Sequence, residues 1–527
     1  MSETAVGERG MATAPHRLAS ESGAEVLRAG GNAVEAMLAM AATIAVVYPH
    51  MNGIGGDVFA VIAEPGKPPR AVDASGRAGA LATIERYAKA GHHEMPARGV
   101  DAALTVAGAV SGWAELLAAA GALGGRIPRA ELLADAVKYA RAGVPVTRSQ
   151  ARDAVDNREE VEGSPGFAAI FLPEGKPHEA DATLVQERLG DTLDRLAHAG
   201  FTDFYRGDIA ATLAADLEAA GSAVTREDLR SHEARLVQPL SLRVSSATVF
   251  NTPPPTQGIA SLIVLGLFDR LKVKRAESFE HIHGLIEATK RANTVRDAEV
   301  ADPSYAGDVA RFLDPAWLDA EALTIDRRRA APWPSRERGG DTIWMGAIDA
   351  DGVAISFIQS LFWAFGSGVV SPRTGVLWHN RGSSFSLDPK SRNALAPGKK
   401  PFHTLNPPLA RFDDGRTMVY GSRGGDAQPQ FQAQIFSRYV LGVEPGEAIA
   451  APRWRFGCEA GEQAEVTMEN RFDPDLVAAL EHAGHSVLVL GEGYSDSMGH
   501  AGMVVRRADG RVMGASDPRS DGIALGG

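Results

Sequence analysis

The chain has 527 residues, 44% hydrophobic and 23% charged, so it can bury large cores and is too long for one ordinary domain. Its formal net charge is −12 and its basic residues are dispersed, which argues against nucleic acid or an anionic membrane surface as a partner. The single cysteine, Cys458, excludes an intrachain disulfide and a multi-cysteine metal site.

The N-terminal segment and the longest apolar stretch bear on location. The start, Met-Ser-Glu-Thr, lacks the basic region and apolar core of a secretory signal, so we expect a cytoplasmic protein. The longest apolar stretch, 33–48, carries Glu35 and is shorter than the ~20 residues that a membrane helix needs. We therefore expect a buried core helix there and no membrane partner.

The first two thirds of the chain alternate between helical and strand-like patterns. Residues 19–144 show helical periodicity that Gly30-Gly31 interrupts, and Pro128 is placed as the first residue of a helix that includes 130–137. Helices are also predicted over 184–199 and 209–220, and strands over 240–244 and 247–251. The segment 325–341, which contains Arg327-Arg328-Arg329, is rich in Arg, Pro, Gly and Ser and is predicted to be an exposed loop.

The pattern changes at Thr342. Apolar runs at 342–348 and 353–358 flank Asp349-Ala350-Asp351-Gly352, which predicts a hairpin with Thr342 at a strand tip. Later strands are expected at 417–420, 487–490 and 503–506, and helices at 430–441 and 474–483. Mixed helices and strands without regular βαβ alternation predict an α+β fold with antiparallel sheets between helices.

The dipeptide Asp341-Thr342 follows a small, flexible Gly339-Gly340 approach. Cleavage before Thr342 would give one residue both a nucleophilic hydroxyl and a free α-amine. That amine titrates near ~7.7–8.0, so it can accept the hydroxyl proton near neutral pH. Taken alone, Gly-Gly-Asp can also be an ordinary turn leading into the hairpin.

Six motifs, in order, make the sequence from about Pro15 to its end resemble the gamma-glutamyltranspeptidase family of N-terminal-nucleophile hydrolases. They are Gly53-Ile54-Gly55-Gly56-Asp57, Phe204-Tyr205-Arg206-Gly207, Thr225-Arg226-Glu227-Asp228-Leu229, Pro253-Pro254-Pro255-Thr256-Gln257-Gly258, Gly340-Asp341-Thr342 and Gly421-Ser422-Arg423-Gly424-Gly425. The resemblance implies a four-layer αββα sandwich, here with an additional helical region in the N-terminal half. It also implies self-cleavage into residues 1–341 and 342–527, and no cofactor or metal.

The resemblance assigns the catalytic positions. Thr342 is the expected nucleophile and, through its α-amine, the base, with Asp341 preceding the cut. Gly424-Gly425 matches the family's paired backbone donors to the oxyanion, where glycine lets the main chain approach closely. Ser360 matches a hydroxyl that hydrogen-bonds the nucleophile. The alternatives are an ordinary Gly-Gly turn and an exposed strand serine.

The substrate positions depart from the family. Arg77 matches the arginine that binds a glutamyl α-carboxylate, and His403-Thr404 replaces a pair of hydroxyl residues. The three ligands of the α-ammonium group correspond to Phe362, Arg381 and Ser384, where an ammonium would meet a guanidinium and a benzyl group. Burying it there unpaired costs several kcal/mol. Arg423 is a further candidate for the carboxylate; a surface arginine and core aromatic packing are the structural alternatives for Arg77 and Phe362.

These departures predict a substrate with an acyl carboxylate and no α-amine, as in the family branch that includes oxamate amidohydrolase. Two alternatives stay open: a gamma-glutamyltransferase or glutathione hydrolase, and an unprocessed, non-catalytic binding protein. The pairs His92-His93 and His281/His283 lack the helix spacing of a metalloprotease, so no metal is expected. The sequence leaves the oligomeric state open.

Overall fold

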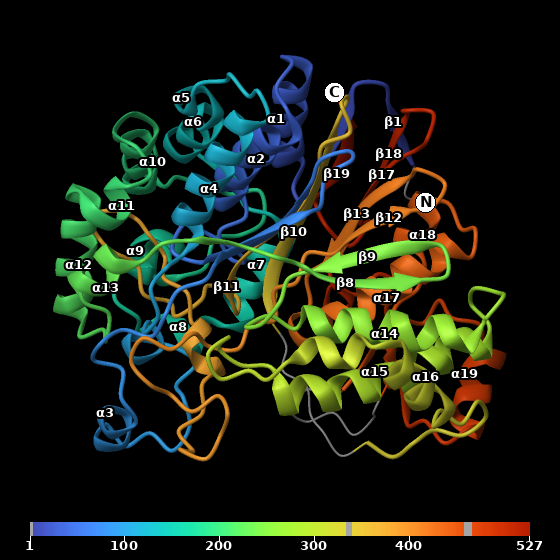
Figure 1. Cartoon of the computed structure of the whole chain (residues 1–527). Coiled ribbons are helices and arrows are strands. Elements are labelled where there is room, and N and C mark those ends of the chain that lie inside the picture. The colour runs from blue at the N-terminus through green and yellow to red at the C-terminus, as the bar shows by residue number, and fades with distance from the viewer. Residues whose placement is uncertain (1–3, 334–339, 458–465) are drawn as a thin grey trace.

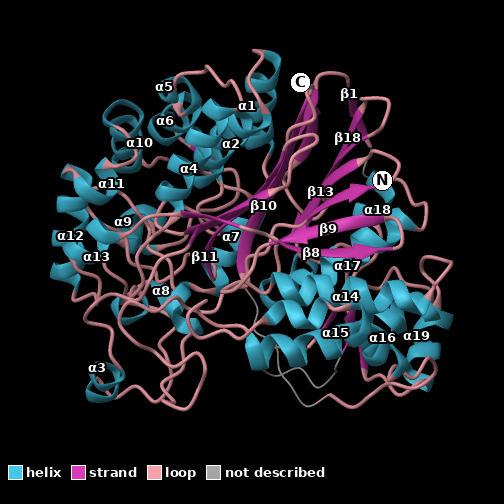
Figure 2. Ribbon diagram, in the orientation of Figure 1, coloured by secondary structure: helices cyan, strands magenta, loops and turns pink. Residues whose placement is uncertain are grey.

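The computed structural model describes residues 4–333, 340–457 and 466–527, and two antiparallel sheets of seven strands dominate it (Figures 1 and 2). The first sheet has the order β19 (Ile523–Gly526), β2 (Gly10–Ala14), β10 (Asp341–Asp349), β11 (Ala354–Phe362), β3 (Asp57–Ala63), β4 (Arg70–Ala74) and β7 (Arg235–Val237). The second has the order β1 (Ala5–Gly7), β18 (Val512–Ser516), β17 (Ala501–Arg506), β13 (Thr417–Ser422), β12 (Leu409–Phe412), β9 (Ala247–Asn251) and β8 (Leu240–Val244).

Helices cover the outer face of each sheet, which completes four layers. The first sheet packs against α1 (Arg17–Arg28), α2 (Ala33–Val47) and α4 (Ala109–Ala122). The second packs against α14 (Gly258–Leu271), α17 (Gln428–Val440) and α18 (Pro445–Ala450). Figure 2 shows the strands between these two groups of helices. The arrangement is the predicted α+β sandwich.

An additional helical region lies beside the first sheet, at the left of Figure 1, as expected for the N-terminal half. It comprises α3 (Ile84–Lys89), α5 (Arg129–Leu132), α6 (Ala134–Ala142), α7 (Arg148–Asp156), α8 (Arg158–Val161), α9 (Phe167–Phe171), α10 (Glu187–Ala199), α11 (Asp203–Arg206), α12 (Asp208–Ala220) and α13 (Arg226–Ser231). A short two-stranded sheet, β5 (Val144–Pro145) and β6 (Thr183–Leu184), joins it.

The rest of the chain packs around the second sheet. Helices α15 (Phe279–Glu299) and α16 (Pro315–Leu323) pack against α14, and α19 (Pro474–His482) packs against α15. A three-stranded sheet is formed by β14 (Trp454–Phe456), β15 (Val466–Met468) and β16 (Val487–Val489). No helix in the described ranges is long and apolar enough to cross a membrane.

The apolar stretch at 33–48 forms the buried helix α2, as predicted. Every residue of α2 is buried, which explains why it is apolar on all sides. Asn32 and Glu35 form a capping box at its N-terminus, so local hydrogen bonds fix where it begins. Pro128 is a correction: it is extended and precedes the first helical residue, and the expected helix is divided at Leu133 into α5 and α6.

The two sheets meet at Trp344 of β10, whose ring lies in the apolar layer between them. Its Nε1 donates to Ser356 Oγ at 2.9 Å. A Cβ on Gly421 would lie 2.3 Å from Trp344 Cδ1, and a Cβ on Gly502 would lie 2.5 Å from Cζ3. Strands β13 and β17 therefore need glycine where the indole ring crosses them.

We expect Gly502→Ala to destabilise the protein by about 1–3 kcal/mol, because the methyl group overpacks the ring in a rigid intersheet core. Gly121→Ala, in α4 with open space around its Cβ position, is the matched control and should be neutral or slightly stabilising. Denaturant unfolding of both variants checks this. Equal stability of the two variants would contradict the packing described for Trp344.

Candidate active site

Thr342 lies at an irregularity in the central hairpin. Strand β10 pairs with β11 through Asp341 opposite Phe362 and Ile343 opposite Gln359, so two residues of β11 face Thr342. Such a bulge re-aims side chains at a strand end. Thr342 is 1% exposed in this uncut chain. The predicted strand tip is confirmed, and the bulge is a feature that periodicity did not indicate.

Ser360 links the hydroxyl of Thr342 to the peptide bond before it. Thr342 Oγ1 donates to Ser360 Oγ at 3.0 Å, and Ser360 Oγ donates to the Asp341 carbonyl oxygen at 2.7 Å. The amide of Phe362 donates to Ser360 Oγ at 2.7 Å. Ser360 therefore holds the hydroxyl of Thr342, the nucleophile candidate, and polarises the Asp341 carbonyl that Thr342 would attack. Ser360 is 2% exposed, so it is not an exposed strand serine.

Phe362 adopts an uncommon backbone conformation beside this network. Its φ is +84°, in a region that residues other than glycine rarely occupy. The conformation belongs to the residue whose amide reaches Ser360 Oγ. Backbone strain of this kind concentrates at functional sites, where the surrounding structure enforces it.

Gly424 and Gly425 lie next to the cleavage segment. Both have positive φ, +136° and +53°, and a Cβ on Gly424 would lie 2.5 Å from Phe431 Cε2. A Cβ on Gly340 would lie 3.0 Å from the Gly425 Cα, so the two backbones are in close approach. The structure thus brings the paired glycines to the scissile region, while their role as oxyanion donors stays a prediction.

Arg423 pairs with the carboxylate of Asp341. It also forms an ion pair with Asp496 and donates to the Asp496 carbonyl oxygen at 2.7 Å. The other carboxylate oxygen of Asp341 accepts the amide of Ala364 at 3.1 Å. The residue before the proposed cut is therefore fixed at its carboxylate by a charge-assisted contact and a backbone amide.

Buried acids and bases surround this pair. Burial, and next the charge of Asp341, raise the pKa of Asp153 to about 8. Burial opposes ionisation of Asp496, but Arg423, His500 and Arg152 outweigh it and hold the pKa of that carboxyl well below its usual range. The sequence analysis missed Arg152, Asp153 and Asp496, because the first two, on α7, lie far in the sequence from Asp496 and none of the three belongs to a local motif.

Four predicted substrate residues gather around a buried guanidinium. Arg381 donates to Thr404 Oγ1 at 3.0 Å and to Ser384 Oγ at 3.3 Å, and its central carbon lies 3.5 Å from the centre of the Phe362 ring. Burial lowers the pKa of Arg381 to about 9. His403 lies nearby in the same interior, its Nε2 3.2 Å from Asp57 Oδ2. Burial, and next Arg381, lower the pKa of His403 to about 4, so it is neutral.

Arg77 is not brought to Thr342. Its guanidinium donates to the Gly398 carbonyl oxygen at 2.8 Å and pairs with Asp302 at 3.3 Å. It lines a separate pocket with Asp228 and His232. In this uncut chain its geometry gives no support to the predicted contact with a substrate carboxylate.

A cavity of about 1280 Å³ opens at the cleavage segment. It exceeds the ~300–1,000 Å³ of ordinary ligand pockets, so a small substrate and water both have room. Gly340, Asp341, Arg423 and Gly424 line it, and the remaining lining includes Arg98, Trp363, Ala364, Ser383, Phe385, Arg455 and Asp496. Of the predicted site residues, Asp341, Arg423 and Gly424 therefore line one accessible space, whereas Thr342, Ser360, Gly425 and Arg381 are not among its lining residues.

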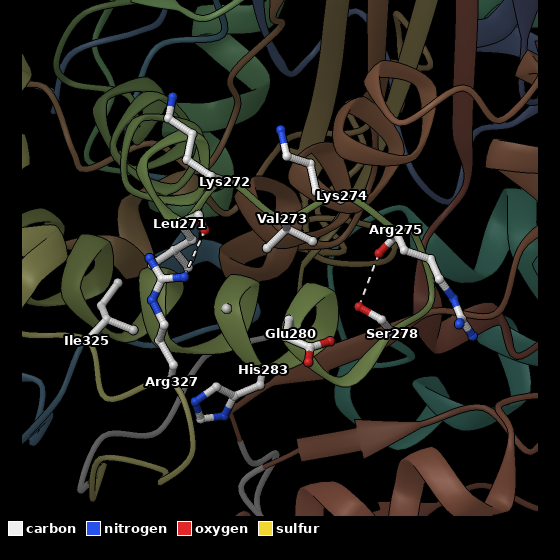
Figure 3. A pocket seen from close by; sticks show the side chains of 11 residues that line it. Leu271, Lys272, Val273, Lys274, Arg275, Ser278, Glu280, His283, Ile325 and Arg327 are labelled. Atoms are coloured by element: carbon white, nitrogen blue, oxygen red, sulfur yellow. Dashed lines mark hydrogen bonds between the residues drawn. The ribbon is translucent and has the colours of Figure 1, made fainter.

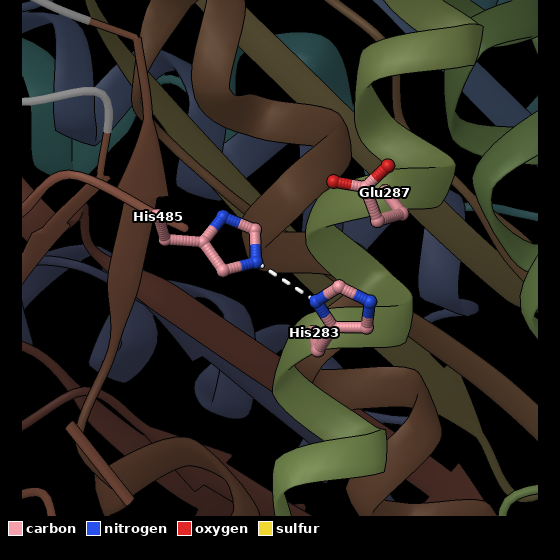
Figure 4. A group of neighbouring side chains, drawn as sticks. All are labelled: His283, Glu287 and His485. Carbon is pink, nitrogen blue, oxygen red and sulfur yellow. Dashed lines mark hydrogen bonds between the residues drawn. The ribbon is translucent and has the colours of Figure 1, made fainter. Parts of the chain in front are cut away.

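Two other features lie apart from the residues that line this cavity. A hollow at the end of α14 is lined by Lys272, Lys274, Arg275 and Arg327, and it contains none of the predicted site residues (Figure 3). In Figure 4, His283 of α15 faces His485 with 2.8 Å between Nδ1 and Nε2.

The group in Figure 4 includes Glu287 and has the spacing of a possible cation site. Lys290 and Arg291 already neutralise the Glu287 carboxylate, at 3.0 and 3.2 Å. The Nε2 of His283 donates to the Asp326 carbonyl oxygen at 2.8 Å, which leaves its Nδ1 to accept from His485. These contacts account for the cluster without a metal.

A hydroxyl residue at the start of a central strand, between two antiparallel sheets and beside paired glycines, is the arrangement that the resemblance to N-terminal-nucleophile hydrolases implies. The gamma-glutamyltranspeptidase family profile matches residues 19–527, and the chain belongs to this family. The predicted family and amidohydrolase class are confirmed.

Individual relatives cover the whole chain. It is 50% identical to the oxamate amidohydrolase proenzyme of Klebsiella pneumoniae, over 100% of both chains. It is 38% identical to the glutathione hydrolase-like YwrD proenzyme of Bacillus subtilis, again over 100% of both. The crystal structure of cephalosporin acylase from Bacillus halodurans matches with a TM-score of 0.91 at 31% identity, covering 100% of this chain and 97% of that one.

We expect Ser360→Ala to slow self-cleavage on the order of 10²–10³-fold, the usual effect of removing one oxyanion donor. Ser360→Thr keeps the hydroxyl and should cleave much faster than the alanine variant. A pulse-chase of freshly synthesised chains on denaturing gels measures both rates. Cleavage of Ser360→Ala at the wild-type rate would remove Ser360 from the mechanism.

Proposed function

We propose that this chain is a precursor that cleaves itself between Asp341 and Thr342, and that the mature enzyme hydrolyses small, carboxylate-bearing amides such as oxamate. The observation that carries the proposal is the Ser360 hydroxyl, which contacts both Thr342 Oγ1 and the Asp341 carbonyl oxygen. The likeness to an oxamate amidohydrolase proenzyme supports the substrate class.

Maturation follows from that contact. Thr342 Oγ attacks the Asp341 carbonyl carbon, the C–N bond breaks, and the α-amine of Thr342 leaves with a proton. The resulting ester joins the Asp341 carbonyl to Thr342 Oγ until water hydrolyses it. Both large sheets contain strands from 1–341 and from 342–527, so the two chains stay associated through a shared core.

Catalysis repeats the same chemistry on an external amide. The free α-amine takes the proton from Thr342 Oγ, the hydroxyl attacks the substrate carbonyl, and ammonia leaves. Water then attacks the acyl ester and restores the hydroxyl. The amides of Gly424 and Gly425 are the proposed donors to the oxyanion.

The charges near the site favour an anionic substrate without an α-amine. Arg423 lines the cavity, and the positions that would bind an ammonium hold Phe362, Arg381 and Ser384. An ammonium beside Arg381 would face a like charge. The glutathione-hydrolase alternative stays open, because relatives with that name cover the chain at lower identity, as in the 28% identical Escherichia coli proenzyme.

A non-catalytic binding protein does not fit the family membership together with an intact Asp341-Thr342 pair. The cytoplasmic location stays a prediction, as do the contributions of Arg77, His403 and Thr404 to substrate binding.

Purified protein should contain two chains, 1–341 and 342–527, the second beginning with Thr342. Thr342→Ala should give one full-length, inactive polypeptide, because both attack steps lose their hydroxyl. Denaturing electrophoresis with N-terminal sequencing checks the cut. A second chain beginning elsewhere, or an active uncut protein, would contradict the proposal.

Removing the α-amine from a test substrate should leave turnover unchanged or improve it. The comparison is kcat/KM for a glutaryl anilide and for the corresponding gamma-glutamyl anilide, with oxamate measured beside them. A tenfold preference for the gamma-glutamyl compound, about 1.4 kcal/mol in transition-state binding, would return the enzyme to glutathione-type chemistry.

A further inference from the structure

In the uncut chain, Asp341 is the substrate of the self-cleavage reaction, and the side chain of Asp341 is bound by neighbouring residues. The acyl group that Thr342 attacks during maturation is the Asp341 carbonyl, which accepts the Ser360 hydroxyl at 2.7 Å. The carboxylate of the same residue pairs with Arg423 and accepts the Ala364 amide at 3.1 Å. One residue therefore shows where an acyl carbonyl and its carboxylate lie at the same time.

The maturation ester and a catalytic acyl-enzyme share one chemical group. Both are esters of Thr342 Oγ, and the cavity that would supply water to both is lined by the adjacent Asp341. In aspartate, two carbons separate the carboxylate from the main-chain carbonyl. The maturation ester is therefore a substituted succinyl ester whose carboxylate is held by Arg423.

After cleavage, we expect Asp341 to leave its contacts with Arg423 and the Ala364 amide. Cleavage removes the covalent bond to Thr342 and creates a second carboxylate on Asp341. That carboxylate forms on the residue whose side-chain carboxylate already shares Arg423 with Asp496. Crowding of like charges in a buried setting is unfavourable.

Departure leaves a carboxylate-sized position with its donors in place. Arg423 keeps its contacts to Asp496, which orient its guanidinium, and the Ala364 amide stays in the loop after β11. Arg423 and Ala364 both line the cavity, so the position is reachable from outside. A buried guanidinium that has lost one of two carboxylates is a strong site for another anion.

We propose that the mature enzyme also hydrolyses monoamides of four-carbon dicarboxylic acids, with succinamate as the simplest, and binds their carboxylate at Arg423 and the Ala364 amide. The inference rests on the proposed function of Thr342 as an N-terminal nucleophile. It adds an activity toward a longer acyl group than that of oxamate. In oxamate the carboxylate is bonded directly to the reacting carbonyl, whereas in succinamate two carbons separate them.

The reaction balances with water as co-substrate. Thr342 Oγ forms an ester with the amide carbon of succinamate, and the C–N bond breaks. The Thr342 α-amine passes the hydroxyl proton to the leaving ammonia. Water then attacks the ester through the same amine, giving succinate and ammonium and restoring the Thr342 hydroxyl.

Ammonia release from the mature enzyme tests the proposal with malonamate, succinamate, glutaramate, the neutral butyramide and oxamate. Among the first three, kcat/KM should be highest for succinamate. It should exceed that for butyramide about a hundredfold, as expected for a buried charge-assisted contact. A maximum at another chain length, or equal rates for succinamate and butyramide, would overturn the inference.

Variants at Arg423 separate binding from folding. Arg423→Met should reduce the preference for succinamate over butyramide to within a few-fold, and Arg423→Lys should keep part of it. Arg243→Met, which removes an exposed pair with Asp413, is the matched control and should keep the full preference. A preference that persists in Arg423→Met would also overturn the inference.

The outcomes distinguish the two proposals. Turnover of oxamate with no preference for succinamate over butyramide defeats only the further activity. Loss of all amide turnover defeats the proposed function as well. If Arg423→Met does not mature, the chain-length series on the wild-type enzyme decides the question.

Discussion

The structure of the site depends on two consecutive hydrogen bonds at the bulge between β10 and β11. Ser360 Oγ accepts from the Thr342 hydroxyl and donates to the Asp341 carbonyl oxygen at 2.7 Å. A hydroxyl group beside a planar amide is ordinarily unreactive. Here the extra residue in β11 brings the two groups to one serine hydroxyl, which accepts from the first and donates to the second, so the attack begins from an ordered arrangement. Two residues beyond Thr342 along β10, Trp344 packs in the apolar layer between the two sheets.

Charge supplies the second constraint. The Asp341 carboxylate is tied to Arg423, which is itself held by Asp496, so the acyl group before the cut is fixed at both its carbonyl and its side chain. We propose that the same contacts orient the precursor for self-cleavage and define a carboxylate position for external substrates. Self-processing and catalysis would then use one set of residues, with the α-amine added only after the cut.

Local patterns predicted much of the fold. Alternating apolar residues predicted the bounds of β8 and β9, and the apolar stretch at 33–48 predicted the buried helix α2. Sequence motifs predicted Thr342 and Ser360 as site residues, and the structure places their hydroxyl groups in contact. The β-bulge, the pairing of Arg423 with Asp341, and the buried Asp153 depend on contacts between distant segments, which no periodicity encodes. Arg77 shows the reverse: a motif match without a contact to the site.

The most direct measurement traps the ester that the Ser360 arrangement is built to form. Hydroxylamine added to freshly folded precursor competes with water for an ester between Thr342 Oγ and the Asp341 carbonyl. Mass spectrometry of the 1–341 chain should then find a hydroxamate at its C-terminal Asp341, in a proportion that rises with hydroxylamine concentration. A chain that always ends in a free carboxylate would contradict attack by the Thr342 hydroxyl on the bond that precedes it.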